Sequence, residues 1–365
     1  MKIGIPTEIK AQEGRVALLP VQVRALVTGG NELFVQSGAG LLAGASDTDY
    51  AAAGATILST ASEVYETAEL IVKVKEILPP EFDLLKEHHI LLTNIHSAND
   101  RRQLDQLMKV GLIAISAEDT HQFGSPNCPL AGEVGAFEGV RLSLATHGGT
   151  GRHFMAHFGA PAAKAIVLGL GHVGRGALRT LISLGVEVVG LDISPGARKQ
   201  AELDWHNTSF RAAPITDLAD HLADADMIFN CVMWPKHRDD HLVSRTDLAK
   251  LKRTAVIVDI SCDEGGAIET SRPTTWQEPV YVEDGIRHFC VDNIPGAVPV
   301  TSSAGYAAAL LPHITSIALH GPLEACRRDP WLARGLTCAR GVLTHKEAAT
   351  VQGRKFTAAA DYLSE

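Results

Sequence analysis

The sequence has few cysteines, no cluster of positive charge and no long apolar run. Its six cysteines are widely spaced and no two form a CxxC pair, which argues against a disulfide framework and a structural zinc site. The net charge of −9 argues against a nucleic-acid-binding protein, because phosphate binding needs a basic face. No apolar run approaches membrane-spanning length, and the opening MKIGIPTEIK lacks a signal-peptide core. We expect a cytoplasmic protein with small-molecule partners and no metal, nucleic acid or membrane partner.

The composition and length instead indicate two globular domains. The chain has 365 residues, of which 45% are hydrophobic and 21% charged. In its first part short apolar strands alternate with helical patterns, which predicts parallel strands joined by crossover helices. Strands are expected at KIGIP, ELFVQSG, ATILS, LIVKV, HILLTNI and GLIAISAE, and helices at PVQVRALVTGG and ASEVYETA.

A glycine-rich turn between a strand and a helix is the strongest local signal. Residues 163–194 read AKAIVLGLGHVGRGALRTLISLGVEVVGLDIS. A buried strand runs into Gly169, Gly171 and Gly174, which permit a tight turn, close approach of a pyrophosphate and close helix packing, with the helix N-terminus facing the anion. A second strand ends at Asp192, near the distance expected for an acid that binds the adenosine ribose. The predicted cofactor-binding residues of this segment are Gly169, Gly171, His172, Val173, Gly174 and Asp192.

The same region bears on the choice of nicotinamide cofactor. The Asp192 carboxylate would repel the ribose 2′-phosphate of NADP(H), so NAD(H) is favoured. Arg198 lies a few residues further on and could soften that preference, so NADP(H) is not excluded.

Later apolar strands, DMIFNCVM and AVIVDIS, continue the pattern of parallel strands. Asp292 and Asn293 follow another predicted strand and are expected on the nicotinamide side of the cofactor.

Two long helical patterns flank this nucleotide-binding unit, at 129–147 and 302–326. They suggest that the unit is inserted into the first domain, whose last part comes from the C-terminal segment. The predicted fold is therefore α/β with two domains, a Rossmann dinucleotide-binding domain inserted into a Rossmann-like (flavodoxin-like) substrate domain. The expected boundaries are 1–128 and 304–365 for the substrate/catalytic domain and 129–303 for the NAD-binding domain.

Several segments, in one order and over nearly the full length, resemble the alanine dehydrogenase family. They are GIPTEIK…GRVALLP, LIVKVKE, NIH, GLGHVG, VDISCDEGGAIETSRPTT, CVDNIPGAVPVTSS and GLTCARGVLTHKEA. The wider superfamily includes saccharopine dehydrogenases, related opine-type synthases and the NAD(H)-binding component of proton-translocating transhydrogenase. The resemblance implies an NAD-dependent oxidoreductase of amino-acid metabolism that forms a homo-oligomer, often a hexamer.

The resemblance also implies roles for particular residues. Arg15 matches the family's substrate-carboxylate arginine, Lys75 its active-site lysine and His96 its catalytic histidine. Asp263 matches the acidic residue that the nucleotide-binding domain contributes. A guanidinium can bind both carboxylate oxygens, an ammonium stabilises developing negative charge, and an imidazole exchanges protons near neutral pH. Lys73, on the same predicted strand as Lys75, is expected to reach solvent.

Departures from the family pattern keep the substrate open. Ala131 and Gly132 stand where the family has a Met-Ser pair, and Asn94 stands where it has a bulky apolar residue. His153 and His157 form an unusual histidine pair.

Three candidate functions follow from these observations. The first is an amino-acid dehydrogenase of the alanine type, which converts a small L-amino acid to a 2-oxo acid and ammonia through an imine. The second is an opine- or saccharopine-type enzyme that condenses a 2-oxo acid with an amino-acid amine, and the third is a transhydrogenase-like NAD(H)-binding module.

Overall fold

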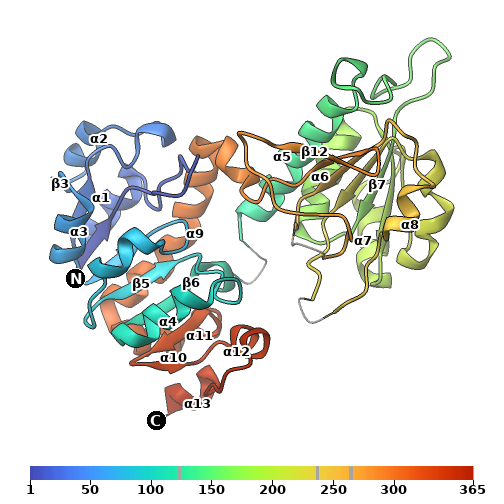
Figure 1. Cartoon of the computed structure of the whole chain (residues 1–365). Helices are drawn as coiled ribbons and strands as arrows, with labels where there is room; N and C mark the ends of the chain where they lie inside the picture. Colours follow the sequence, from blue (N-terminus) through green and yellow to red (C-terminus); the bar gives the residue numbers. More distant parts are fainter. Residues whose placement is uncertain (122–124, 236–237, 263–265, 365) are drawn as a thin grey trace. The chain divides into compact units, whose positions relative to one another are not determined.

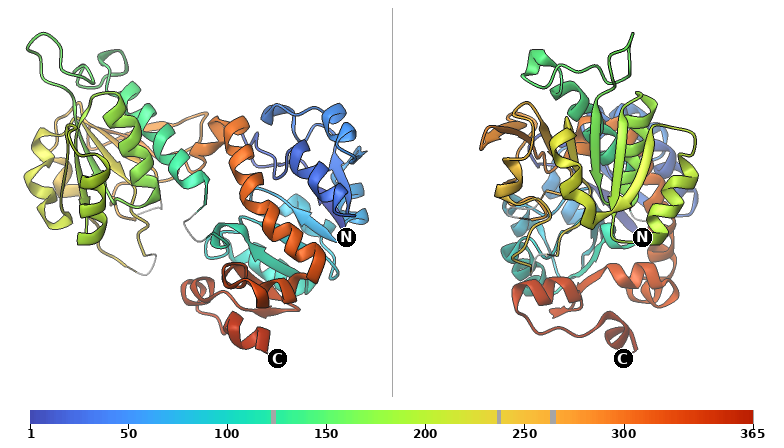
Figure 2. Two further views of the ribbon diagram at one scale, coloured as in Figure 1. Left: turned by 180° about the vertical axis from the view of Figure 1, so that it is seen from behind. Right: turned by 90° about the vertical axis from the view of Figure 1, so that its right-hand side faces the viewer.

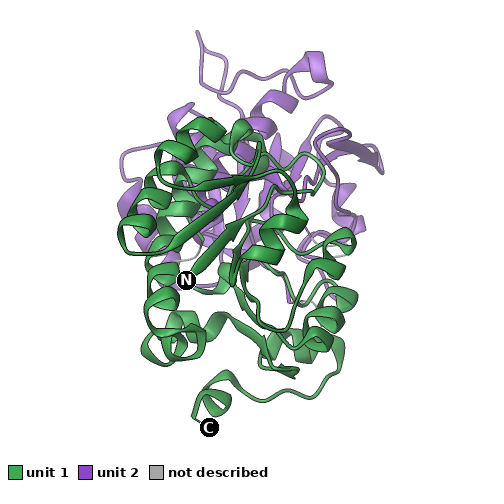
Figure 3. Cartoon of the chain, turned by 90° about the vertical axis from the view of Figure 1, so that its left-hand side faces the viewer, with its two compact units in different colours: residues 1–126, 296–365 green, residues 127–295 purple. Residues whose placement is uncertain are grey.

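The chain folds as two compact units (Figure 3). The computed structural model describes residues 1–121, 125–235, 238–262 and 266–364. Unit 1 comprises residues 1–126 and 296–365, and unit 2 comprises residues 127–295. The long helix α9 (Pro299–His320) therefore belongs entirely to unit 1. In the described ranges, no helix is both long enough and apolar enough to cross a membrane.

Unit 1 is built on an eight-stranded sheet (Figure 1) with the order β15-β14-β6-β5-β4-β1-β2-β3. The six strands β1 to β6 all run parallel to one another, as the alternating sequence pattern predicts. A C-terminal hairpin, which the sequence pattern does not predict, adds β14 antiparallel to β6 and β15 antiparallel to β14. The strands are β1 (Lys2–Ile5), β2 (Glu32–Gln36), β3 (Thr56–Leu58), β4 (Leu70–Val72), β5 (Ile90–Thr93), β6 (Ile113–Ser116), β14 (Leu336–Ala339) and β15 (Val342–Leu343).

Helices cover both faces of this sheet. On one face α1 and α9 bury apolar side chains against the strands, among them Val23, Tyr306 and Leu310. Helices α3 and α4 pack against the other face through Tyr65 and Leu107. Figure 2 shows α9, in orange, running along the sheet. The helices of unit 1 are α1 (Pro20–Thr28), α2 (Asp47–Ala52), α3 (Ala61–Thr67), α4 (Arg101–Val110), α9, α10 (Pro322–Arg328), α11 (Pro330–Gly335), α12 (Lys346–Gln352) and α13 (Ala359–Ser364).

The long helix predicted over 302–326 is in fact two helices. Gly321 adopts φ 79°, in the left-handed region that a glycine enters without steric cost, and α9 ends there. Pro322 then begins α10, where its missing N–H costs no helical hydrogen bond. The prediction of one continuous helix is therefore wrong at this point.

Unit 2 contains a seven-stranded sheet with the order β12-β13-β11-β10-β7-β8-β9. All neighbouring strands are parallel except the β12–β13 pair. This order places β7 between β10 and β8, with the chain winding outward on both sides, which confirms the predicted Rossmann arrangement. The elements are α5 (Asn127–Leu142), β7 (Lys164–Leu168), α6 (His172–Ser183), β8 (Glu187–Asp192), α7 (Pro195–Asp204), β9 (Phe210–Pro214), β10 (Met227–Asn230), α8 (Arg245–Leu248), β11 (Val256–Asp259), β12 (Val280–Glu283) and β13 (Ile286–Phe289).

Two glycines allow α5 and α6 to pack closely. A Cβ at Gly132 would lie 2.0 Å from the Val173 carbonyl oxygen, and one at Gly176 would lie 2.0 Å from the Pro129 carbonyl oxygen. Neither position therefore accepts a side chain without displacing a helix. Gly132, where the family resemblance implies a residue with a side chain, thus fits a close approach of two helix backbones.

Lys73 is buried, which contradicts the expectation that it reaches solvent. Its Nζ lies 3.1 Å from Glu8 Oε2 and 2.9 Å from Glu81 Oε1, and its side chain is 0% exposed. Burial opposes the charge of Lys73, but the two carboxylates outweigh it and raise the pKa of the ammonium. Tyr65 donates to Glu81 Oε1 at 2.9 Å, and the Val74 N–H donates to Glu8 Oε1 at 2.6 Å. Strand β4 ends at Val72, directly before Lys73.

We expect Lys73→Ala to lower the free energy of unfolding by about 3–5 kcal/mol, because it leaves two buried carboxylates without their cation. Urea unfolding followed by circular dichroism measures this change. Lys86→Ala is the control, because Lys86 is 47% exposed and lies 3.9 Å from Glu66 at the surface. Equal and small effects of the two changes would mean that the Glu8–Lys73–Glu81 network contributes little.

Candidate active site

The predicted substrate residues of unit 1 follow the carboxyl ends of neighbouring parallel strands. Arg15 lies in the loop after β1, Lys75 lies just beyond β4, and His96 lies just beyond β5. The strand order reverses between β1 and β4, and ligands of such sheets bind at that point, outside the carboxyl ends. Asp263, the fourth predicted residue, lies outside the described residues.

Arg15 is held in one orientation by an acid two residues earlier. Glu13 Oε1 accepts from Arg15 Nε at 2.8 Å and Oε2 accepts from Nη2 at 2.5 Å. The same carboxylate accepts the Arg15 backbone N–H at 2.9 Å. Both side chains are buried. The two parallel hydrogen bonds fix the plane of the guanidinium. Sequence reasoning did not identify Glu13 as the partner of Arg15.

Lys75 is buried and its backbone is tied to the neighbouring strand. The Thr93 hydroxyl donates to the Lys75 carbonyl oxygen at 2.7 Å. Lys75 Nζ lies 3.8 Å from Glu76 Oε2, and Lys10 Nζ lies 2.9 Å from the other oxygen of Glu76. Burial acts to raise the pKa of Glu76, but the charges of Lys75 and Lys10 outweigh it and lower that pKa to about 2. Glu76 is therefore ionised at neutral pH and favours the charged form of Lys75.

His96 occupies an unusual backbone conformation beside a carboxylate. Its φ is 47°, a left-handed value that a non-glycine residue adopts at a cost, and such conformations concentrate at functional sites. Glu118, two residues after β6, accepts the His96 N–H at 2.7 Å and the Ile95 N–H at 3.1 Å. The His96 ring is 41% exposed and its Nδ1 lies 3.7 Å from Glu118 Oε1.

The pKa of Glu118 is raised to about 7. Burial is the main cause and the charge of Asp119 adds to it, while the two backbone donors from His96 and Ile95 oppose the rise. Sequence reasoning missed Glu118. The available signal was its position as the last residue of GLIAISAE, at the end of a predicted parallel strand.

Tyr306, on α9, connects these strand ends. Its hydroxyl lies 3.0 Å from the Lys73 carbonyl oxygen and 3.4 Å from Asn94 Oδ1, both acceptors for its proton. Burial raises the pKa of the Tyr306 phenol far above its usual value, and the charges of Glu118 and Glu8 raise it further, whereas that of Arg15 lowers it. The phenol therefore stays protonated and acts as a donor. Asn94, the polar departure from the family pattern, is thus hydrogen-bonded within unit 1.

In unit 2 a cavity of about 390 Å³ lies at the carboxyl ends of β7, β8 and β10. It brings together Gly169, Gly171 and Asp192, three of the predicted cofactor-binding residues. The other lining residues are Ile193, Ile215, Cys231, Val232, Trp234, Arg238 and Leu242. The guanidinium of Arg238 lies 4.3 Å from the centre of the Trp234 ring. This cavity has the position expected for the adenosine part of a dinucleotide.

The turn between β7 and α6 fits a pyrophosphate. A Cβ placed on Gly171 would meet nothing within 4 Å, so the backbone here is open to a ligand. Gly171 is the N-cap of α6, and within the described structure no side chain caps this helix start. Helix N–H groups and the helix dipole at such a terminus bind phosphate. Gly174, by contrast, faces the turn itself, since its Cβ would lie 1.9 Å from the Gly169 carbonyl oxygen.

Asp192 is oriented by backbone donors. Its Oδ2 accepts the Leu170 N–H at 2.7 Å and its Oδ1 accepts the Ser194 N–H at 2.7 Å. Arg198 does not pair with this carboxylate. It donates from Nη1 to the carbonyl oxygens of Asp192, at 2.7 Å, and Ile193, at 3.2 Å. The guanidinium of Arg198 is therefore engaged with the end of β8.

The remaining predicted residues do not line this cavity. His172 is exposed at the start of α6, and Val173 is half-buried. Asp292 is exposed, and Asn293 is buried, with its carbonyl oxygen accepting from Trp276 Nε1 at 3.1 Å. The histidine pair His153 and His157 is exposed, with ring centres 6.0 Å apart.

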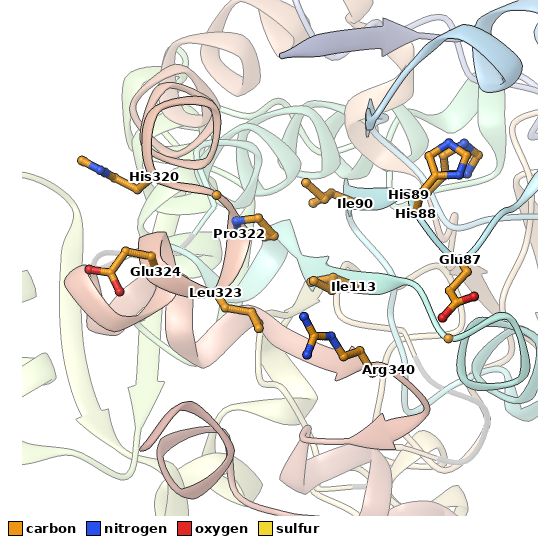
Figure 4. Close-up of a pocket in the computed structure, with 12 residues that line it drawn as sticks. Glu87, His88, His89, Ile90, Ile113, His320, Pro322, Leu323, Glu324 and Arg340 are labelled. Atoms are coloured by element: carbon orange, nitrogen blue, oxygen red, sulfur yellow. The ribbon is translucent and has the colours of Figure 1, made fainter. Parts of the chain in front are cut away.

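A second cavity, of about 470 Å³, lies in unit 1 at the amino ends of β5 and β6 (Figure 4). Ile90 and Ile113 line it where these strands begin, and His88, His320 and Arg340 lie around it. Since His96 and Glu118 follow the opposite ends of the same strands, this cavity is separate from the predicted substrate residues.

The sequence matches two family profiles. Residues 4–125 match the N-terminal domain of alanine dehydrogenase/PNT, and residues 136–346 match its C-terminal domain. Similar curated proteins are alanine dehydrogenases from Mycobacterium tuberculosis, 34% identical over 371 residues, and Methanococcus maripaludis, 35% identical over 376 residues. In both pairs the alignment covers 100% of each chain.

Solved structures show the same similarity. An L-alanine dehydrogenase is 34% identical, with a TM-score of 0.89 and coverage of 97% of this chain and 99% of that one. A transhydrogenase from Sinorhizobium meliloti is 23% identical, with a TM-score of 0.76 and coverage of 95% and 99%. The second likeness concerns the fold alone.

Two glycine variants test the predicted pyrophosphate site. We expect Gly171→Ala to leave the melting temperature nearly unchanged but to weaken NADH binding at least about 10-fold, because the methyl group would stand where the anion approaches. Gly174→Ala should lower the melting temperature, because its methyl group overlaps the backbone of the turn. Thermal unfolding and NADH fluorescence titration measure both effects. Normal NADH affinity in Gly171→Ala would contradict the assignment.

Proposed function

Since this chain belongs to the alanine dehydrogenase/PNT family, we propose that it catalyses the reversible oxidative deamination of a small L-amino acid, alanine in the first instance, to a 2-oxo acid and ammonia. It is an oxidoreductase acting on a CH–NH2 donor, and it uses a nicotinamide dinucleotide. One structural observation carries the proposal of the reaction. Arg15, Lys75 and His96 follow the carboxyl ends of β1, β4 and β5 on either side of the strand-order reversal.

The proposed roles follow from the chemistry of these side chains. Arg15, oriented by Glu13, and Lys75, beside the Glu76 carboxylate, bind the substrate carboxylate and carbonyl oxygen. A dinucleotide held at Gly169, Gly171 and Asp192 would supply the acceptor for the hydride of the substrate α-carbon, and water would add to the resulting imine. His96 accepts and returns the protons of water attack and amine release. Asp263 orients the amine or the attacking water, as the family resemblance implies.

We assign the dinucleotide to the cavity at Gly169, Gly171 and Asp192. Gly171 leaves room for the pyrophosphate, and the Asp192 carboxylate, fixed by two backbone N–H groups, accepts from the ribose hydroxyls. NAD(H) is preferred over NADP(H). Asp192 repels a 2′-phosphate, and Arg198 is already engaged with backbone carbonyl oxygens and is poorly placed to offset that repulsion.

The function is tested by following NADH oxidation by the purified protein with pyruvate and ammonium. Parallel reactions replace ammonium with a panel of amino acids, or pyruvate with 2-oxoglutarate. Turnover with pyruvate and ammonium supports the proposal. Turnover only with an amino-acid donor would assign the protein to the opine-forming reaction, and NADH binding without turnover would contradict both.

We expect Lys75→Ala to lower kcat/KM for pyruvate by about 1,000-fold or more while the Kd for NADH is unchanged, because the lost ammonium stabilises charge on the reacting substrate. Lys10→Ala is a matched control, since Lys10 pairs with the same Glu76 from a more exposed position. Steady-state kinetics and NADH titration provide the comparison. A similar loss in both variants would mean that the charge of Glu76, rather than Lys75 itself, matters.

We also expect Asp192→Asn to lower the ratio of kcat/KM for NADH to kcat/KM for NADPH by about 10-fold or more, because it removes the charge that repels a 2′-phosphate. Glu187→Gln, at the amino end of the same strand β8, should leave the ratio unchanged. An unchanged ratio in Asp192→Asn would show that Asp192 does not set the cofactor preference.

A further inference from the structure

Glu118 reaches the His96 loop through both carboxylate oxygens. Oε2 accepts the Ile95 N–H at 3.1 Å, and Oε1 accepts the His96 N–H at 2.7 Å. Oε1 also lies 3.7 Å from His96 Nδ1, too far for a direct hydrogen bond but close enough for the imidazolium and carboxylate charges to interact. A single carboxylate thus acts on the backbone and on the ring of the same residue.

The backbone contacts explain how His96 keeps its left-handed conformation. A non-glycine residue at φ 47° persists where the surrounding structure over-determines it. Here two successive N–H groups, at Ile95 and His96, point at one carboxylate. Such paired donors fix the turn and, with it, the direction in which the His96 side chain leaves the backbone.

Other charged or titratable groups near Glu118 lie on its own turn, on α11, on the C-terminal segment and on α9. Arg334, on α11, donates from Nε to the Asp119 carbonyl oxygen at 2.7 Å. Asp119 is adjacent on the same 3-10 turn, Ala117–Asp119, and its Oδ2 lies 3.0 Å from His345 Nε2. His345 Nδ1 lies 3.3 Å from Ser97 Oγ, so this second pair contacts the next residue of the His96 loop. The Tyr306 phenol, on α9, is near enough for the charge of Glu118 to act on it. Asp119 therefore faces the C-terminal segment, whereas Glu118 faces His96.

We propose that Glu118 is a positioning residue for His96, which holds the imidazole in its working orientation and stabilises its protonated form. The proposal rests on the proposed function, in which His96 exchanges protons with the substrate. In the direction of amino-acid oxidation, a proton released during water attack passes to the His96 ring. The positive charge that forms is then balanced by the carboxylate next to it, and the same proton is returned when the reaction runs toward the amino acid.

The pH dependence of the reaction tests this role. The pKa of Glu118 lies near the usual pKa of a histidine, so Glu118 and His96 titrate as a coupled pair. This pair takes up its first proton at a higher pH than His96 would without the carboxylate beside it. Neutral His96 is the form that accepts a proton, so the acid limb of kcat/KM for alanine reports this uptake. Glu118→Gln should therefore move the acid limb to lower pH by at least about half a unit, besides lowering kcat.

Asp119→Asn is the matched control. It removes a neighbouring carboxylate that faces His345 rather than His96, and it eases ionisation of Glu118. The acid limb in this variant should stay nearly in place, because the Glu118 carboxylate still lies next to His96. A fall in kcat with an unmoved acid limb in Glu118→Gln would overturn the proposal and reduce Glu118 to a structural role.

A second measurement does not depend on turnover. With ¹³C-labelled histidine, the Cε1 signal of His96 is identified by its absence in His96→Asn and titrated in the native protein and in Glu118→Gln. The His96 pKa should fall in the variant, and an unchanged titration would overturn the proposal. If the protein fails to oxidise alanine but the titration shifts, the proposed function fails while the coupling of Glu118 to His96 stands.

Discussion

A buried ammonium between two carboxylates fixes the part of unit 1 on which the candidate site depends. Lys73 contacts Glu8 from the loop after β1 and Glu81 from the segment after β4. Each of the three residues that follow β4 makes a backbone hydrogen bond to another element. Glu8 accepts the Val74 N–H, Tyr306 donates to the Lys73 carbonyl oxygen, and Thr93 donates to the Lys75 carbonyl oxygen. The backbone at Lys75 and the two residues before it is therefore placed by contacts from the loop after β1, from α9 and from β5. A buried charge of this kind is costly alone and rigid when fully paired.

At Arg15, His96 and Asp192 the predicted sites share one feature, a carboxylate that accepts backbone N–H groups. Glu13 binds both the backbone and the guanidinium of Arg15, and Glu118 binds the backbone of His96. Asp192 binds one N–H in the turn after β7 and one in the turn after β8. Backbone donors cannot rotate away, so each carboxylate has a defined position before any ligand arrives. In such an arrangement little reorganisation is needed when a substrate or dinucleotide binds.

Local signals in the sequence predicted the features that depend on neighbouring residues. The strand, the glycine turn and Asp192 lie within one stretch of about thirty residues, so their pattern can be recognised from the sequence without knowledge of the three-dimensional structure. Lys73 was misjudged because its partners, Glu8 and Glu81, join it only when β1 and β4 pair. Glu118 was missed for the same reason, since its meeting with His96 depends on the register of β5 and β6. The β14–β15 hairpin likewise follows from a contact with a strand more than two hundred residues earlier.

The two departures from the family pattern have different physical consequences. Gly132 removes a side chain where the backbones of α5 and α6 approach, so the change is accommodated by helix packing within unit 2. Asn94 instead places an amide between β5 and α9, where its oxygen accepts from Tyr306. Because the phenol also binds the Lys73 carbonyl oxygen, Asn94 belongs to the same hydrogen-bonded framework as Lys75. The polar Asn94 is thus part of the hydrogen-bonded framework that supports the candidate substrate site. An effect of Asn94 on substrate choice acts through the position of Lys75 as well as through the Asn94 amide itself.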